Sequence, residues 1–540
     1  MYLIDKYIRI IYCLARVAML VMLAFCSVHP VFAQKANWQN LDLKTDTVFG
    51  ISTEKAYTEL LKGKKAKTVI VAVIDAGVDT AHEDLKAALW HNPKEKAGNH
   101  KDNDHNGYAN DVYGWNFIGS DKGNVHFDNS ELTRQVRQSS PRFLGKDSSQ
   151  IDARDMPAFR IWYKERADLK QQLREARSMT NNISSFKNVL DSILVKMGKQ
   201  NPALDDFKSY EPKNANEKNV KANMVQFLQH DGDFDQFLTD KLEKELNHYR
   251  EEADYHLNVN YDPRSIVGDD YFNSAQRYYG NNDVTGPDAS HGTHVAGIIA
   301  ADRNNGIGVK GVADNVRIMT IRVVPMGDER DKDIANAICY ATDNGAKVIN
   351  MSFGKGYSQD KKVFDDAIKY AMSKDVLIIH AAGNSNEDLD QKENYPNRNY
   401  ADGSGAANAW IEVGASGWID DETLKAGFSN YGKNTVDVFA PGEKILSTIP
   451  GSKYEAYDGT SMAAPVVAGL AALIREYYPK LSAVQVKEII LKSVVKVNHP
   501  VMVPKDKQKV QEAFFHLCRT GGIVNAYNAL QMAEVYTVNQ

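Results

Sequence analysis

Residues 67–77 read KTVIVAVIDAG, an almost continuous run of apolar and β-branched side chains that ends in Asp-Ala-Gly. Such a run is typical of a strand that is buried on both faces, as in a parallel sheet. Further runs of this kind follow at 317–324, 347–351, 376–381 and 411–415, with helical patterns between them at 331–343 and 360–373. Strands that alternate with helices predict a doubly wound, mostly parallel α/β sheet with ligands at the carboxyl ends of its strands.

The composition is that of a globular protein. The chain has 540 residues, of which 43% are hydrophobic and 25% are charged, and its net charge is −5 at pH 7. The apolar content is enough to bury a large core, which argues against a disordered chain. A dedicated nucleic-acid-binding protein would carry an excess of basic residues, so we expect no nucleic acid as a partner.

The first 33 residues predict a secretory signal peptide. Two arginines precede an apolar run at 17–28, and Val31–Ala33 places small or aliphatic residues at the two positions that signal peptidase reads. The run is shorter than the ~20 residues that span a bilayer, so we expect no transmembrane span in the mature chain. A lipoprotein anchored through Cys26 is the less favoured alternative, because the bulky Phe25 stands where a small residue is usual. We expect export to the periplasm, the cell surface or the medium.

Loss of that segment would leave two cysteines, Cys339 and Cys518. Two cysteines cannot form a disulfide framework, and a chain of this length does not need one. We favour two buried thiols that pack as small hydrophobic side chains, with a single disulfide as the alternative.

Four short segments at strand ends or helix starts carry the chemistry of the chain. They read VIDAG at 73–77, SHGTHVAG at 290–297, AAGN at 381–384 and GTSMAAP at 459–465. A serine at a helix entrance exposes its hydroxyl beside backbone N–H groups, which stabilise negative charge on a nearby oxygen. A histidine can take the serine proton and return it to a leaving amine, and an aspartate can fix the imidazole tautomer. The predicted helix behind the serine runs from Val466 to Tyr477, with Pro465 in its first turn.

Together these segments resemble those of the subtilisin-like serine peptidases, whose catalytic residues follow the same order of Asp, His and Ser. The resemblance implies a serine endopeptidase with Asp75, His291 and Ser461 as its catalytic residues and no cofactor for catalysis. Asn384 would donate its side-chain amide to the oxyanion, and loss of such a donor costs on the order of 3 kcal/mol. His294 is expected to be structural, because the catalytic base of the family is the first His of HGTH.

The resemblance also implies protein or peptide substrates and a place for them to bind. The segment NMSFG at 350–354 is similar to the one whose extended backbone pairs with the substrate, and residues 380–383 would form the opposite wall. Asn394 replaces the small residue that is common in relatives with large apolar pockets, so we expect a narrower or more polar pocket. The predicted substrate-binding residues are Ser352, Phe353, Gly354 and Gly383.

Two loops predict a structural calcium ion that takes no part in catalysis. The segment 304–313 resembles a calcium loop of many subtilisins, and Asp84 matches its carboxylate ligand. The segment DNDHNG at 102–107 alternates oxygen ligands and ends at a glycine, although Tyr113 stands where a calcium loop has an acidic residue. A solvated turn rich in Asn and Asp is the alternative for this second loop.

The resemblance is interrupted between Asp75 and His291. Residues 131–257 are rich in Lys, Glu, Gln, Asn and Asp and show helical periodicity at 158–178, 184–197 and 234–255. This pattern predicts a large helical insertion, with a partly disordered linker as the alternative. The predicted organisation is a signal peptide (1–33), a first part of the catalytic domain (34–130), the insertion (131–257) and a second part (258–540). The alternative function is a binding protein that keeps the subtilisin fold while the insertion covers its cleft.

Overall fold

A computed structural model of the chain describes residues 35–230, 232–505 and 508–538. The predicted signal peptide and Cys26 lie outside these residues. Within the described ranges, no helix combines the length and the apolar character that a membrane crossing requires. Both cysteines of the described chain are free thiols, with Cys518 buried and Cys339 partly buried.

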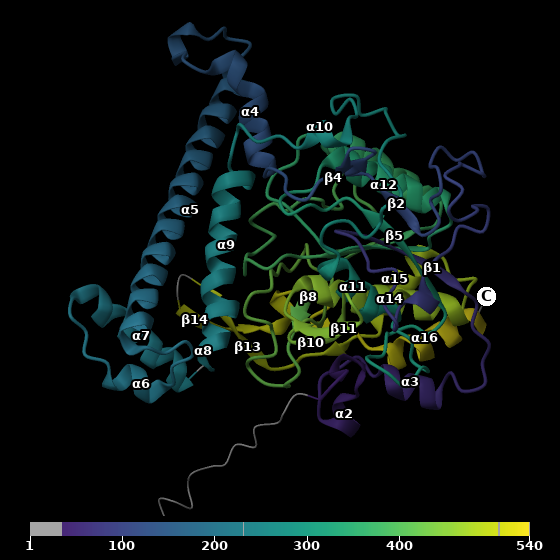
Figure 1. Cartoon of the computed structure of the whole chain (residues 1–540). Helices are drawn as coiled ribbons and strands as arrows, with labels where there is room; N and C mark the ends of the chain where they lie inside the picture. Colours follow the sequence, from purple (N-terminus) through teal and green to yellow (C-terminus); the bar gives the residue numbers. More distant parts are fainter. Residues whose placement is uncertain (1–34, 231, 506–507, 539–540) are drawn as a thin grey trace, which may run out of the picture.

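A nine-stranded sheet forms the centre of the molecule (Figure 1). All neighbouring strands pair in parallel except the edge pair β12 and β15, which confirms the predicted mostly parallel sheet. From one edge to the other, the strands are β12 (Val495–Lys496), β15 (Gly522–Ile523), β9 (Val438–Pro441), β8 (Trp410–Ser416), β7 (Leu377–Ala381), β6 (Val348–Met351), β1 (Val69–Asp75), β5 (Val316–Arg322) and β2 (Gly114–Asn116).

Strand β1 lies between β5 and β6, at the point where the order of strands along the chain switches from one side of the sheet to the other. In open α/β sheets, ligands bind at the carboxyl ends of the strands beside such a point. The last residue of β1 is Asp75, so the fold places this carboxylate at the predicted position of a binding site.

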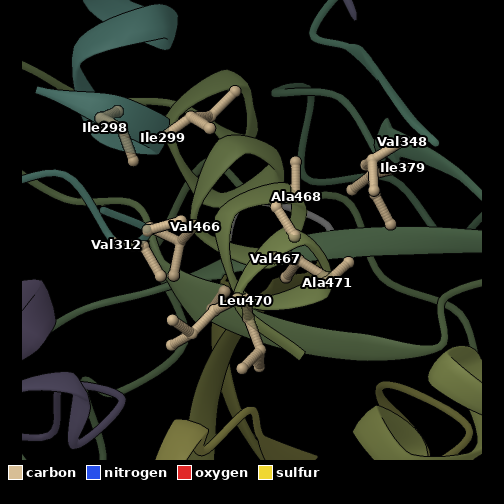
Figure 2. Packing of buried hydrophobic residues seen from close by; sticks show 14 of the residues in the cluster. Ile298, Ile299, Val312, Val348, Ile379, Val466, Val467, Ala468, Leu470 and Ala471 are labelled. Carbon is tan, nitrogen blue, oxygen red and sulfur yellow. The ribbon is translucent and has the colours of Figure 1, made fainter. Parts of the chain in front are cut away.

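Alternate side chains of β1 enter two different helical layers, as expected of an extended strand. Val71 and Val73 pack with α11 (Ser290–Ala300) and α14 (Thr460–Tyr477) in one layer, part of which is shown in Figure 2. Ala72 and Ile74 pack with α12 (Asp331–Asp343) and α13 (Lys361–Ser373) in the other. The three layers confirm the doubly wound α/β fold.

Residues 131–257 form a helical arm beside this body (Figure 1). The predicted helices at 158–178 and 184–197 are one continuous helix of 42 residues, α5, which packs against α4, α7 and α9. Apolar side chains of the arm bury one another in clusters of their own, so the segment is helical and packed along its length. Its elements are α4 (Glu131–Phe143), η3 (Ser148–Gln150), α5 (Met156–Met197), α6 (Leu204–Ser209), α7 (Ala215–His230), α8 (Phe234–Gln236), η4 (Phe237–Glu243), α9 (Lys244–Glu251) and η5 (Glu252–His256).

The remaining elements are short or lie at the edges of the body. They are η1 (Trp38–Asn40), α2 (Leu43–Asp46), α3 (Thr53–Glu59), η2 (Lys86–Ala88), β3 (Gly119–Ser120), β4 (Gly123–Asn124), α10 (Arg264–Val267), β10 (Ile445–Ile449), β11 (Lys453–Tyr457), α15 (Ala483–Lys492), β13 (Pro500–Lys505), β14 (Gln508–Ala513), η6 (Phe514–His516) and α16 (Ala526–Val538).

Candidate active site

The start of α11 meets the end of β1 and brings a histidine to an aspartate. His291 Nδ1 lies 2.7 Å from Asp75 Oδ1, which also accepts the backbone N–H of Ala76 at 2.7 Å. This contact depends on Gly292, because a Cβ at that position would lie 2.2 Å from the carbonyl oxygen of Gly77. A larger residue would therefore push α11 away from β1 and separate the pair.

The pair joins a buried carboxylate to a half-exposed imidazole. The side chain of Asp75 is 2% exposed and that of His291 is 39% exposed, so the imidazole can reach a bound ligand. Burial lowers the pKa of His291, but the charge of Asp75 and the hydrogen bond between them raise it more, and the net pKa lies above its ordinary value. The aspartate thus stabilises the imidazolium form.

Ser461 lies in the first turn of α14, which begins at Thr460. The predicted start at Val466 was wrong, and so was the placement of Pro465 in the first turn, because this proline lies inside the helix. A proline has no N–H, so the carbonyl of Ser461, four residues earlier, has no helical partner. The Ser352 hydroxyl donates to that carbonyl over 2.9 Å and replaces the missing bond.

The hydroxyl of Ser461 is itself hydrogen-bonded to Ser352. It donates to the backbone carbonyl of Ser352 over 3.1 Å, so the two serines exchange hydrogen bonds. Among the described residues, no hydrogen bond joins Ser461 to His291. The hydroxyl must turn away from Ser352 before the imidazole can take its proton.

Thr460 fixes the carboxamide of Asn384. Its backbone N–H and its hydroxyl both donate to Asn384 Oδ1, each over 2.9 Å. The Thr460 hydroxyl also accepts the backbone N–H of Gly383 at 3.0 Å. With its oxygen held in this way, Asn384 presents its amide nitrogen, a donor, on its other side.

A pocket of about 330 Å³ adjoins Ser461 and Asn384. It is lined by all four predicted substrate-binding residues, Ser352, Phe353, Gly354 and Gly383. Asn394 also lines the pocket, and its carboxamide lies against Gly354, since a Cβ at Gly354 would be 3.2 Å from the amide nitrogen. Of the described residues 131–257, none lines this pocket.

His294 is held inside the protein, as expected of a structural histidine. Its Nε2 lies 3.0 Å from the carbonyl of Glu455, and its ring stacks on Tyr457 with 4.3 Å between ring centroids. Burial lowers the pKa of His294 to about 3, so the ring stays neutral. Sequence reasoning missed Thr460, for which the only local signal was its place beside Ser461 in GTSMAAP.

The two candidate calcium loops differ in how their oxygens are used. Asp84 Oδ1 accepts from Asn305 Nδ2 at 2.6 Å and its Oδ2 accepts from the backbone of Val309 at 3.0 Å, so both oxygens have protein donors. The carboxylate of Asp84 thus holds the loop at 304–313 through hydrogen bonds.

The loop around 102–107 combines a turn with a cluster of carboxylates. Asp102 accepts the backbone N–H groups of Asn106 and Gly107, which is the predicted turn rich in Asn and Asp. Oxygens of Asp104 and of two residues outside the predicted segment, Glu95 and Asp111, lie within 4.8 Å of one another. Glu95 Oε2 is buried without a partner in the described chain, so this oxygen set fits a cation.

Comparison with known proteins places the chain in a family. The family model described as "Subtilase family" matches residues 66–517. The "Thermophilic serine proteinase" of Bacillus sp. (strain AK1) is 43% identical over 187 residues, which are 34% of this chain and 42% of that protein. "Subtilisin DY" of Bacillus licheniformis is 39% identical over 224 residues, which are 41% of this chain and 74% of that protein.

The match to these relatives is partial in length. The chain spans 42% of the thermophilic serine proteinase and 47% of the alkaline protease of Alkalihalobacillus alcalophilus, less than half of each. A solved structure of proteases from Pseudoalteromonas arctica PAMC 21717 contains a chain that is 31% identical to this one. The match covers 47% of this chain and 74% of the other, with a TM-score of 0.37.

Proposed function

Since this chain belongs to the subtilase family, we propose that it is a serine endopeptidase that hydrolyses peptide bonds in proteins. The observation that carries the proposal is the hydrogen-bonded pair of Asp75 and His291 at the carboxyl end of the sheet. It is supported by the adjoining pocket, which both Ser461 and Asn384 line. An acyl-transfer site needs a nucleophile, a base, a group that orients the base and a donor to the oxyanion, and these four residues supply them.

The proposed reaction begins when the Ser461 hydroxyl leaves the carbonyl of Ser352 and gives its proton to Nε2 of His291. Ser461 Oγ then attacks the carbonyl carbon of the scissile bond, and the Asn384 amide donates to the resulting oxyanion. His291 returns the proton to the leaving amine, and a water molecule repeats the sequence to release the acyl group. Asp75 keeps the proton of the imidazole on Nδ1 and stabilises the cation throughout.

The alternative of a binding protein with a covered cleft has less support. None of the described residues 131–257 lines the pocket beside Ser461, and the His291 side chain is accessible to solvent. A binding role also needs none of the four proposed catalytic groups.

Labelling with a fluorophosphonate tests the proposal directly. We expect one phosphonyl adduct per chain, located at Ser461 by mass spectrometry, together with hydrolysis of casein. Protein that has a cooperative thermal transition but neither labels nor hydrolyses casein would contradict the proposal.

We further propose that the chain is exported and acts on proteins outside the cytoplasm. The support is the sequence of residues 1–33, with its arginines, its apolar run and its small residue at Ala33. Release to the periplasm, the cell surface or the medium fits this segment, and anchoring through Cys26 remains the less favoured alternative.

We propose that Asn394 limits the size of the side chain that the pocket accepts. Its Nδ2 donates to the carbonyl of Ala382 at 3.3 Å, which holds the carboxamide beside Gly354. Asn394→Gly is expected to raise kcat/KM for a peptide with phenylalanine before the scissile bond by about tenfold relative to one with alanine. Asn399→Gly makes the same change in the same loop outside the pocket and should keep the wild-type ratio. Equal ratios in both variants would contradict this assignment.

We propose a structural calcium ion at Glu95, Asp104 and Asp111. Calcium at 100 times its Kd would add about 2.7 kcal/mol to the free energy of unfolding, so a chelator should lower the Tm and added calcium should restore it. Asp104→Asn should abolish this response, whereas Asp84→Asn should keep it because Asp84 lies outside this carboxylate cluster. A Tm that is the same with chelator and with calcium would contradict the proposal.

A further inference from the structure

One wall of the substrate pocket continues along the chain as residues 352–359, the wall segment, which contacts the helical arm. Ser352, Phe353 and Gly354 line the pocket, and the chain then runs on to Gln359. Three of its residues, Lys355, Tyr357 and Gln359, contact α4 or the apolar cluster around it.

The first of these contacts is a buried ion pair. Lys355 Nζ lies 3.0 Å from Oε2 of Glu131, the first residue of α4, and both side chains are fully buried. The same ammonium donates to the carbonyl of Glu329 at 2.7 Å and lies 2.8 Å from Asp331 Oδ1. Three oxygens thus surround one charge, and one of them comes from the arm.

Lys355 also connects the wall segment to the segment that carries Asn394. Its backbone N–H donates to the carbonyl of Tyr395 at 2.7 Å, and the N–H of Tyr395 donates back at 2.9 Å. Tyr395 follows Asn394, whose carboxamide packs against Gly354. Lys355, which pairs with Glu131, therefore ties the backbone next to Gly354 to the backbone next to Asn394.

Two further contacts keep the segment in register with the arm. Tyr357 packs against the apolar cluster that contains Leu132 and Val136 of α4. The Gln359 side chain donates to that of Gln138, which lies seven residues after Glu131 and hence on the same face of the helix. The contacts follow one another along both the wall segment and α4.

We propose that Glu131 is a positioning residue of the substrate pocket, through which the arm sets the selectivity for the side chain that precedes the scissile bond. The inference rests on the proposed endopeptidase function. Loss of its charge leaves Lys355 and the neighbouring Arg134, which lies 2.5 Å from Glu131, with one carboxylate fewer in a buried site. The wall must then shift, and a displacement of about 1 Å at a substrate-positioning group can cost about 100-fold in rate.

The test compares Glu131→Gln with Asp269→Asn in the full chain. Asp269 is an equally buried carboxylate, paired with Arg264 and Lys332 at 2.6 Å each, but it does not touch Lys355. Both variants remove one buried charge, so both should lower the Tm. Only Glu131→Gln is expected to change the ratios of kcat/KM among peptides that differ solely before the scissile bond, by about tenfold or more. Labelling by a small fluorophosphonate, which has no such side chain, should keep its wild-type rate.

A double-mutant cycle shows whether Glu131 acts through Lys355. In a Lys355→Met background, Glu131→Gln should add no further change in selectivity, because the group it positions is absent. If Glu131→Gln does not fold, Glu131→Asp keeps the charge on a shorter side chain and should give a smaller change in the same direction.

Three results would overturn the inference. They are unchanged ratios in the Glu131 variants, equal changes in Glu131→Gln and Asp269→Asn, or additive effects in the cycle. Failure of the proposed function is a separate outcome, because the wild-type chain would then neither label nor cleave any peptide of the set.

Discussion

Replacement of Ser461 by alanine is expected to lower kcat/KM on peptide substrates by about a millionfold, which is the scale of the same substitution in subtilisin. The side chain is the only proposed nucleophile at the site, and without Oγ no acyl-enzyme can form. Labelling by a fluorophosphonate should disappear at the same time. Initial rates on a fluorogenic peptide and the mass of the labelled protein measure both effects.

The fold should survive this change. Within the described part of the chain, the hydroxyl of Ser461 makes one hydrogen bond, to the carbonyl of Ser352. A bond of this kind contributes about 1 kcal/mol to the free energy of unfolding. Ser493→Ala is a matched control, because its hydroxyl also donates to one backbone carbonyl but lies outside the pocket. The control should label and cleave like the wild type, and residual activity of Ser461→Ala above about 1% would assign the nucleophile elsewhere.

The second large effect is expected at the carboxylate that orients the base. Asp75→Asn should reduce kcat by about four orders of magnitude, because a carboxamide no longer fixes the Nδ1–H tautomer of His291.

The same substitution should also move the acid limb of the plot of activity against pH. His291 must be neutral to take the serine proton, so wild-type activity falls as the pH drops through its raised pKa. Removal of the negative charge lowers that pKa, and the limb should shift to lower pH.

Asp288→Asn separates the charge effect from the orientation effect. Asp288 also raises the pKa of His291 by its charge, but of these two described carboxylates only that of Asp75 is hydrogen-bonded to the imidazole. Asp288→Asn should shift the acid limb of kcat/KM slightly to lower pH. Its kcat/KM at the pH plateau should equal that of the wild type. An acid limb that stays in place in Asp75→Asn, or a loss of activity below tenfold, would exclude Asp75 from the proposed role.

The central sheet could be predicted from the sequence because its signal is local. Each buried parallel strand is a continuous apolar run, and β1, β5 and β6 begin and end within two residues of the predicted limits. The helix predicted at 331–343 has the same bounds as α12. For the same reason, the short segments around Asp75 and His291 are recognisable from the sequence alone, without their contact.

Contacts between distant segments were not predictable in this way. The start of α14 was misplaced because a proline is read as a helix boundary, whereas here the hydroxyl of Ser352 supplies the bond that Pro465 cannot make. The pairing of Glu131 with Lys355 joins residues far apart in the chain, and neither has a local pattern that marks it. Helix α5 also continues through a polar stretch near residue 180, because Ala176 and Ile183 on either side are buried against other helices.

The hydrogen bond from the Ser461 hydroxyl to the Ser352 carbonyl determines the fraction of chains in which this hydroxyl is free to react. A bond that contributes about 1 kcal/mol leaves roughly one chain in six with its hydroxyl turned free. That fraction slows the attack on a substrate severalfold and no more. A protease that had to remain dormant until it reached its destination would need a restraint several kcal/mol stronger than this rotation supplies.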